Sequence, residues 1–350
     1  MTNLCKSTFR SAVILLLTSA TCYGLASCCI DEDLSGCGAE FVMKFDLRVV
    51  SNMSTELQTV LSDEDDRPVA DALRAHLANI FTDRGYDLDL SFYDTEADSI
   101  RLHHEQHIMD ASETTYSLYL PVHNYMHTAL VNLANNPAVS FIGDERCHAA
   151  QLSTVNDGTL RSHTTGLFTA RMPMDVTTAE EQHFFVHLYM SNCATALVLD
   201  TTACDVRDIR ILTSGFADGF RLADSLFTYN SPVTLHATRV PVATGRQACF
   251  CSVSFPSPET PATRLIIETV EPFLANDADE ALWQYQCFVT LANGTTTQTT
   301  LNMRRPLRAG QLKIIKAWLD DHGVVRTEDM TIGVSVTLDW KSGGEYNPIL

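Results

Sequence analysis

The chain has 350 residues, of which 24 are Lys or Arg and 43 are Asp or Glu, and its formal net charge is −19. This acidic balance argues against nucleic acid as a partner, because phosphate contacts require clustered cations. The hydrophobic fraction of 45% is too high for a disordered acidic chain and is sufficient for sizeable cores. At about 150 residues per domain, the length predicts two domains.

Residues 1–27 have the pattern of a bacterial lipoprotein signal peptide. Lys6 and Arg10 precede an apolar run at residues 12–17, which is too short to span a bilayer. Leu25-Ala26-Ser27-Cys28 then has the form of a lipobox. We predict cleavage between Ser27 and Cys28 and acylation of Cys28 by at least two chains, the number needed for stable anchoring. The alternative is an incidental cysteine after an ordinary signal peptide.

Residues 28–39 are predicted to be an acidic lipid tether. The leader contains two cations and no carboxylates, so the mature chain of 323 residues would have a charge of −21. Cys29-Ile30-Asp31-Glu32-Asp33 follows the lipidated cysteine, and anionic headgroups repel carboxylates at this distance. This motif resembles the acidic signal that exports lipoproteins of Bacteroides-type bacteria to the outer face of the outer membrane. A solvated acidic linker is the other interpretation.

The predicted N-terminal domain covers residues 40–179 and is mostly strands. One helix is predicted over residues 68–82, because acidic residues precede Pro68 and apolar residues follow at helical spacing. The acidic run lacks the spacing of a calcium loop. Strands are predicted at residues 41–49, 86–92, 115–122, 128–134 and 167–176. A polar segment at residues 177–182 places the domain boundary near Glu180.

The predicted C-terminal domain covers residues 180–350. Asn293-Gly294 is the strongest hairpin signal and separates strands at residues 283–291 and 295–303. Residues 312–320 fit a short helix or a strand. Other strands are predicted at residues 183–189, 194–200, 206–212, 249–255, 265–270 and 331–340. Runs of short antiparallel strands with turns between them predict a mainly β protein of two β-sandwiches.

The mature chain would contain nine cysteines, and spacing alone does not determine how they pair. Eight remain after lipidation of Cys28: Cys29, Cys37, Cys147, Cys193, Cys204, Cys249, Cys251 and Cys287. Cys249 and Cys251 lie two apart on a predicted strand, at the far limit for a disulfide, and are interpreted as small core residues. A bridge between Cys193 and Cys204 is left open.

No catalytic, metal-binding or cofactor-binding motif stands out, so we predict no enzyme activity, no metal and no cofactor. His103, Glu105 and His107 would share one face of a strand and could hold a metal, but the solvated face of an edge strand is favoured. His183 and His187 are interpreted as structural residues of a strand. A pair of catalytic carboxylates for glycoside cleavage stays open as an alternative, because 43 acids offer many pairs.

The three tryptophans raise the alternative of a surface glycan-binding lipoprotein. Trp283, Trp318 and Trp340 could stack on sugars or anchor the sandwich cores. The alternating patterns around Trp283 and Trp340 favour cores. A glycan binder would require exposed aromatic residues on one platform.

Three stretches together resemble the fimbrillin-associated anchor lipoproteins, the basal subunits of Bacteroides-type type V fimbriae. They are residues 28–37, His187-Leu188-Tyr189 and residues 333–347. The resemblance implies two transthyretin-like β-sandwiches in tandem, here with a short helix in the first. It also implies a structural role, in which the lipid holds the subunit in the outer membrane and the protein docks or terminates the fimbrial shaft. Many members continue the mid-chain strand as Tyr-Arg-Asn, whereas Met190-Ser191-Asn192 follows Tyr189 here.

The same resemblance implies joining to fimbrillin-like shaft subunits by β-strand complementation. The strand at residues 41–49 begins 13 residues beyond Cys28, so cleavage after it would release the protein from the membrane. We therefore expect this strand to stay and to complete the first domain. The predicted docking strand is the last one, with Ile332, Val334, Val336, Leu338 and Trp340 on one face. Whether it donates or accepts a strand stays open.

Overall fold

The computed structural model describes residues 38–96, 99–108, 115–155, 161–178, 182–230, 233–243, 246–260 and 281–338. The predicted signal peptide, the cleavage site at Ser27 and Cys28, and the tether up to residue 37 lie outside the described residues, as do the predicted strand at 265–270 and Trp340. None of the helices in the described ranges is long and apolar enough to cross a membrane.

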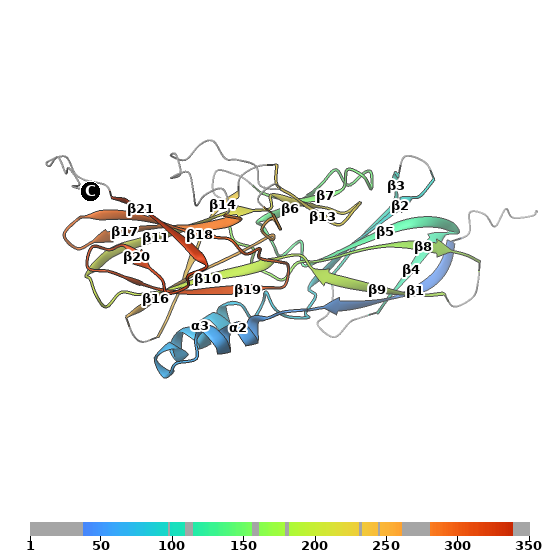
Figure 1. Ribbon diagram of the computed structural model, residues 1–350. Helices are drawn as coiled ribbons and strands as arrows, with labels where there is room; N and C mark the ends of the chain where they lie inside the picture. The colour runs from blue at the N-terminus through green and yellow to red at the C-terminus, as the bar shows by residue number, and fades with distance from the viewer. Residues whose placement is uncertain are drawn as a thin grey trace, which may run out of the picture.

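The described chain is mainly β and forms two sandwiches arranged end to end (Figure 1). The first is a seven-stranded sheet in the order β3-β2-β5-β8-β9-β1-β4. Its strands are β1 (Gly38–Arg48), β2 (Asp87–Asp94), β3 (Arg101–Ile108), β4 (Thr115–Pro121), β5 (His123–Val131), β8 (Phe168–Val176) and β9 (Gln182–Met190). β8 and β9 pair only through Phe168 and Thr169 and then diverge. The sheet therefore folds into two layers around one apolar core.

The second sandwich packs two five-stranded sheets, β15-β16-β10-β19-β20 and β14-β11-β17-β18-β21. Its strands are β10 (Cys193–Asp200), β11 (Val206–Phe216), β14 (Val233–His236), β15 (Thr238–Val240), β16 (Gln247–Ser254), β17 (Trp283–Leu291), β18 (Thr296–Met303), β19 (Leu312–Leu319), β20 (Val325–Arg326) and β21 (Ile332–Leu338). The predicted Asn293-Gly294 hairpin is confirmed between β17 and β18, and Gly294 has the positive φ of 85° that such a turn requires.

The two sandwiches repeat one topology. The layer β3-β2-β5-β8 corresponds to β14-β11-β17-β18, and β4-β1-β9 corresponds to β16-β10-β19. Most pairs are antiparallel, as predicted, but β1–β9 and β10–β19 are parallel in the two sandwiches alike. β21 has no counterpart in the first sandwich, so it is an additional strand at the edge of the repeat.

The helical segment packs on the second sandwich although it follows β1 in the chain. It contains α2 (Met53–Val60), the 3-10 turn η3 (Glu64–Asp66) and α3 (Arg67–His76). The predicted helix begins where expected but ends six residues early, and α2 was not predicted. Leu57 and Leu73 cover small side chains such as Ala196 and Cys251 on the outer face of β16-β10-β19. Both helices lie below this layer in Figure 1. The predicted short helix thus lies in the chain between strands of the first sandwich, as expected, but it packs on the second sandwich.

The predicted boundary near Glu180 falls between β8 and β9, which belong to the same sandwich. β9 pairs along its whole length with β1, from Phe41–Gln182 to Arg48–Tyr189. The change of sandwich therefore comes after β9, at Ser191 and Asn192. The polar segment separates two strands of one sandwich and not two domains.

A small third sheet joins the sandwiches. β6 (Val139–Ile142) and β7 (Gln151–Thr154) belong to the first half of the chain, whereas β12 (Gly219–Arg221) and β13 (Leu226–Thr228) belong to the second. They form one sheet in the order β13-β12-β7-β6. Its apolar side packs on Tyr93 and Leu130, on the outer face of the first sandwich. The two sandwiches therefore share a continuous core at their junction.

Candidate docking site

β21, the predicted docking strand, lies at the edge of its sheet. It pairs with β18 from Ile332–Met303 to Leu338–Thr297, and in the described part of the chain it has no strand on its other side. Ile332 is buried in the core. Val334 faces the same side, opposite the buried Leu301, yet remains 36% exposed. The apolar side of β21 is therefore covered at one end only.

The opposite layer explains this incomplete cover. β20 contains two residues, and its hairpin packs against β18, where Thr297 Oγ1 donates to the carbonyl of Gly323 at 2.7 Å. Val325 N–H also donates to Thr299 Oγ1 at 3.1 Å. The layer that contains β20 therefore ends opposite β18, and β21 extends beyond it. This leaves Val334 partly exposed, a position that we call the ledge, beside a strand edge with which no described strand pairs.

β1 begins at the opposite end of the molecule from the end of β21 (Figure 1). Unlike β21, it is a central strand, with β4 on one side and β9 on the other. Its inward side chains Phe41, Met43 and Phe45 are fully buried. The N-terminal end of β1, at Gly38, therefore lies at the end of the molecule away from β21.

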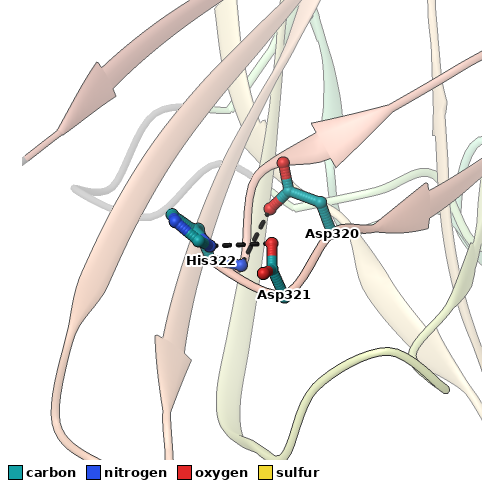
Figure 2. Close-up of side chains that lie close together, drawn as sticks. All are labelled: Asp320, Asp321 and His322. Carbon is teal, nitrogen blue, oxygen red and sulfur yellow. Dashed lines mark hydrogen bonds and ion pairs between the residues drawn. The ribbon is translucent and has the colours of Figure 1, made fainter.

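Within the described ranges, one group of three potential metal ligands has its ligand atoms within 4.8 Å of one another: Asp320, Asp321 and His322 in the β19–β20 turn (Figure 2). Asp320 Oδ1 accepts the N–H groups of His322 and Val324, and its Oδ2 accepts Arg326 Nε at 3.1 Å. Burial acts to raise the pKa of Asp320, but these donors lower it overall. The carboxylate stabilises the hairpin turn.

The His103–Glu105–His107 cluster closes the side of the first sandwich. These residues lie on the inner side of edge strand β3, half-buried, where Glu105 Oε1 lies 2.8 Å from His103 Nε2. Glu105 Oε2 accepts the hydroxyl of Tyr116 at 2.5 Å, from the edge strand of the other layer. The His107 ring packs on Tyr116. Glu105 thus links β3 to β4 through Oε2 only, while its Oε1 contacts His103 on the same strand. The three side chains are not among the described groups whose ligand atoms lie close enough together to hold a metal.

The tryptophans separate into a buried and an exposed residue. Trp283 is buried, and its Nε1 donates to the carbonyl of Arg305 at 3.0 Å, which confirms a core role. Trp318 lies on the outer face of β19 and is 39% exposed.

All described cysteines are free, so Cys193 and Cys204 form no bridge. Burial raises the pKa of the Cys249 thiol to about 12, as expected for an unreactive core residue.

Comparisons with known proteins give likeness of fold at low identity. No protein-family model and no curated protein matches the chain. Similar solved structures include a proposed polysaccharide-binding protein of Bacteroides thetaiotaomicron (TM-score 0.49, 10% identity, 87% of this chain and 99% of that one). Two others are from Porphyromonas gingivalis. The fimbrial anchor protein Mfa2 has a TM-score of 0.45 and 11% identity, with 86% of this chain and 99% of that one covered. The tip fimbrial protein Mfa3 has a TM-score of 0.37 and 10% identity, with 86% of this chain and 100% of that one covered. At these values the likeness carries no conclusion about function.

Proposed function

We propose that this chain is a structural, non-catalytic lipoprotein of the outer membrane that anchors a fimbria at the cell surface. Its N-terminal lipid on Cys28 would hold it in the membrane, and β21 would dock or terminate the shaft by strand complementation with fimbrillin-like subunits. The observation that carries the proposal is the placement of two strands. β1, which follows the predicted tether, begins at one end of the molecule, and the open edge of β21 lies toward the opposite end.

The tethered strand is an integral part of the first sandwich. Removing β1 would separate β4 from β9 and take the buried side chains of Phe41, Met43 and Phe45 out of the core. Each such side chain contributes roughly 1.5–3 kcal/mol through burial. Retention of β1 therefore keeps both the fold and the covalent link to the lipid, as a basal subunit requires.

The open edge supplies the docking surface. An incoming strand could hydrogen-bond to the free side of β21 and cover the ledge at Val334. Exposed strand edges of this kind are otherwise blunted by charges, proline or bulges. The described part of β21 has no charged residue and no proline, so its edge is open to pairing.

The proposal is tested by deleting the gene and complementing it with variants. Deletion should give shed or overlong fimbriae. A chain lacking residues 341–350 should be lipidated normally but should retain fewer fimbriae on cells. Val334→Lys should have the same effect, because it places a charge on the ledge, whereas Thr337→Lys on the opposite face of β21 is the matched control. Normal cell-bound fimbriae in both the truncated and the Val334→Lys strains would contradict docking through β21.

A further inference from the structure

The outer face of the layer β4-β1-β9 has an unusual concentration of exposed aromatic residues. Tyr119 is 63% exposed, Phe185 is 62% exposed and Tyr189 is 58% exposed. Among the described residues only one other aromatic side chain, Trp318, is among the exposed large hydrophobic residues. We call this surface the aromatic face. Large apolar groups gathered on one exposed face mark a binding site more often than scattered ones do.

Strand alternation sets the spacing of the rings on β9. Val186 and Leu188 point into the core, so Phe185, His187 and Tyr189 point outward along one line. Phe185 and Tyr189 are four positions apart, which corresponds to about 13 Å along the strand. A linear ligand lying along β9 could therefore contact both.

The neighbouring strand β1 places a cation beside each of the two rings of β9. In the register of β1 with β9, Lys44 lies next to Phe185 and Arg48 lies next to Tyr189. Asp46 is the carboxylate between these cations. It is bound by Arg48 Nε at 2.6 Å and by His187 Nδ1 at 3.2 Å. In a chain with a net charge of −19, the centre of this face therefore has an excess of positive charge.

The internal repeat shows that the face is not a helix-packing surface left bare. The equivalent layer of the second sandwich, β16-β10-β19, is covered by α2 and α3 and carries small side chains there, including Ala194, Ala196 and Cys251. The first sandwich has aromatic, histidine and basic residues at the corresponding places. These residue types suit a polar ligand better than a packed helix.

A groove of about 300 Å³ continues the aromatic face at the Tyr189 end. His187 and Tyr189 form one wall with Arg171 of β8, and the β12–β13 hairpin forms the other with Leu222 and Phe227. The groove thus adds a further cation and further apolar surface in line with β9.

We propose that the aromatic face and this groove bind an acidic polysaccharide that lies along β9. The apolar C–H faces of sugar rings would stack on Phe185 and Tyr189, while Lys44 and Arg171 would pair with carboxylate or sulfate groups. The site lies on the first sandwich and the β12–β13 hairpin of the joining sheet. It does not involve β21, so it is independent of the proposed docking of a shaft. It would give the protein a second contact at the cell surface.

Binding is measured by calorimetry with the full mature chain, using polygalacturonate and heparin as acidic probes and dextran as a neutral one. We expect binding of an acidic probe that weakens with salt. Phe185→Ala and Tyr189→Ala should each weaken it about tenfold, or roughly 1.4 kcal/mol. Lys44→Gln should reduce the salt dependence. Trp318→Ala, an exposed aromatic residue on the other sandwich, is the matched control and should leave binding unchanged.

Three results would overturn this proposal. The first is no binding of either acidic probe, and the second is dextran binding as tightly as polygalacturonate. The third is full binding by the Phe185→Ala/Tyr189→Ala double variant with an unchanged melting temperature. If purified shaft subunits instead lose affinity for that double variant while the polysaccharides never bind, the face is a protein-docking surface.

Discussion

His127 is a titratable residue enclosed in the core of the first sandwich. Its ring stacks on Phe92 with centroids 4.4 Å apart, and its Nδ1–H donates to the carbonyl of Ser91 at 3.2 Å. Nε2 is buried with no hydrogen-bond partner among the described residues. Burial lowers the pKa of His127 to about 3, because the charged imidazolium would lose its hydration there. His163, packed on Phe255, has its pKa lowered to about 3 for the same reason.

These two residues predict acid sensitivity. Between about pH 6.5 and pH 3 the unfolded chain binds their protons and the folded chain does not, so stability is lost as the pH falls through this window. Each residue should contribute a slope of about 1.4 kcal/mol per pH unit. Denaturant unfolding between pH 7.5 and 4.5 should give a shallower dependence for His127→Phe than for the wild type. His322→Gln, at an exposed turn, is the control, and equal slopes for wild type and His127→Phe would contradict this account.

At the scale of elements, β1 should be indispensable. A chain that starts at Gly38 should fold, whereas one that starts at Ser51 should not, because β4 and β9 lose the strand between them and the core loses Met43. Circular dichroism and gel filtration distinguish these outcomes. A peptide of residues 38–48 added in trans should restore the shorter chain if the groove it leaves is specific. A stable, monomeric chain from Ser51 without the peptide would show that the first sandwich does not depend on β1.

Local patterns predicted some elements well and others only ambiguously. Asn293-Gly294 defined the β17–β18 hairpin to within a residue, since the turn chemistry is local. Residues 312–320 were ambiguous because Ile314 lies under the helices while Ile315 faces the sandwich core. A strand buried on both faces loses the alternation that distinguishes it from a helix. The packing of α2 and α3 on the second sandwich had no local signal at all.

The candidate sites follow the same division. Alternation predicted β21 and its apolar side, but the exposure of Val334 depends on the short β20 in the opposite layer, which no pattern in β21 encodes. Likewise, the outward line of Phe185, His187 and Tyr189 could be predicted from alternation within β9. Whether this line of side chains could form a binding site depends on the register with β1, which brings Lys44 beside Phe185 from a distant part of the sequence. Long-range pairing therefore decides both sites.

At the scale of the whole molecule, the junction makes the two sandwiches one mechanical body. Asn192 lies between β9 and β10. Its side-chain Nδ2 donates to the carbonyl of Thr165 at 2.9 Å, and its backbone carbonyl accepts the N–H of Gly310 at 2.8 Å. Beside it, β7 pairs with β12, with Leu152 opposite Phe220. Such a continuous core would transmit load between the two sandwiches, as the proposed role of a lipid-held anchor requires.

This continuity predicts cooperative unfolding. Calorimetry of the mature chain should give one transition, because the core around Phe220 contains residues from both sandwiches. Phe220→Ala should cost about 3–5 kcal/mol and split the transition into two, since it removes the contact that couples them. Leu226→Ala, an exposed position on the same hairpin, is the control and should preserve one transition. Two transitions in the wild type would instead mean that the sandwiches unfold independently and that the bridging sheet couples them only weakly.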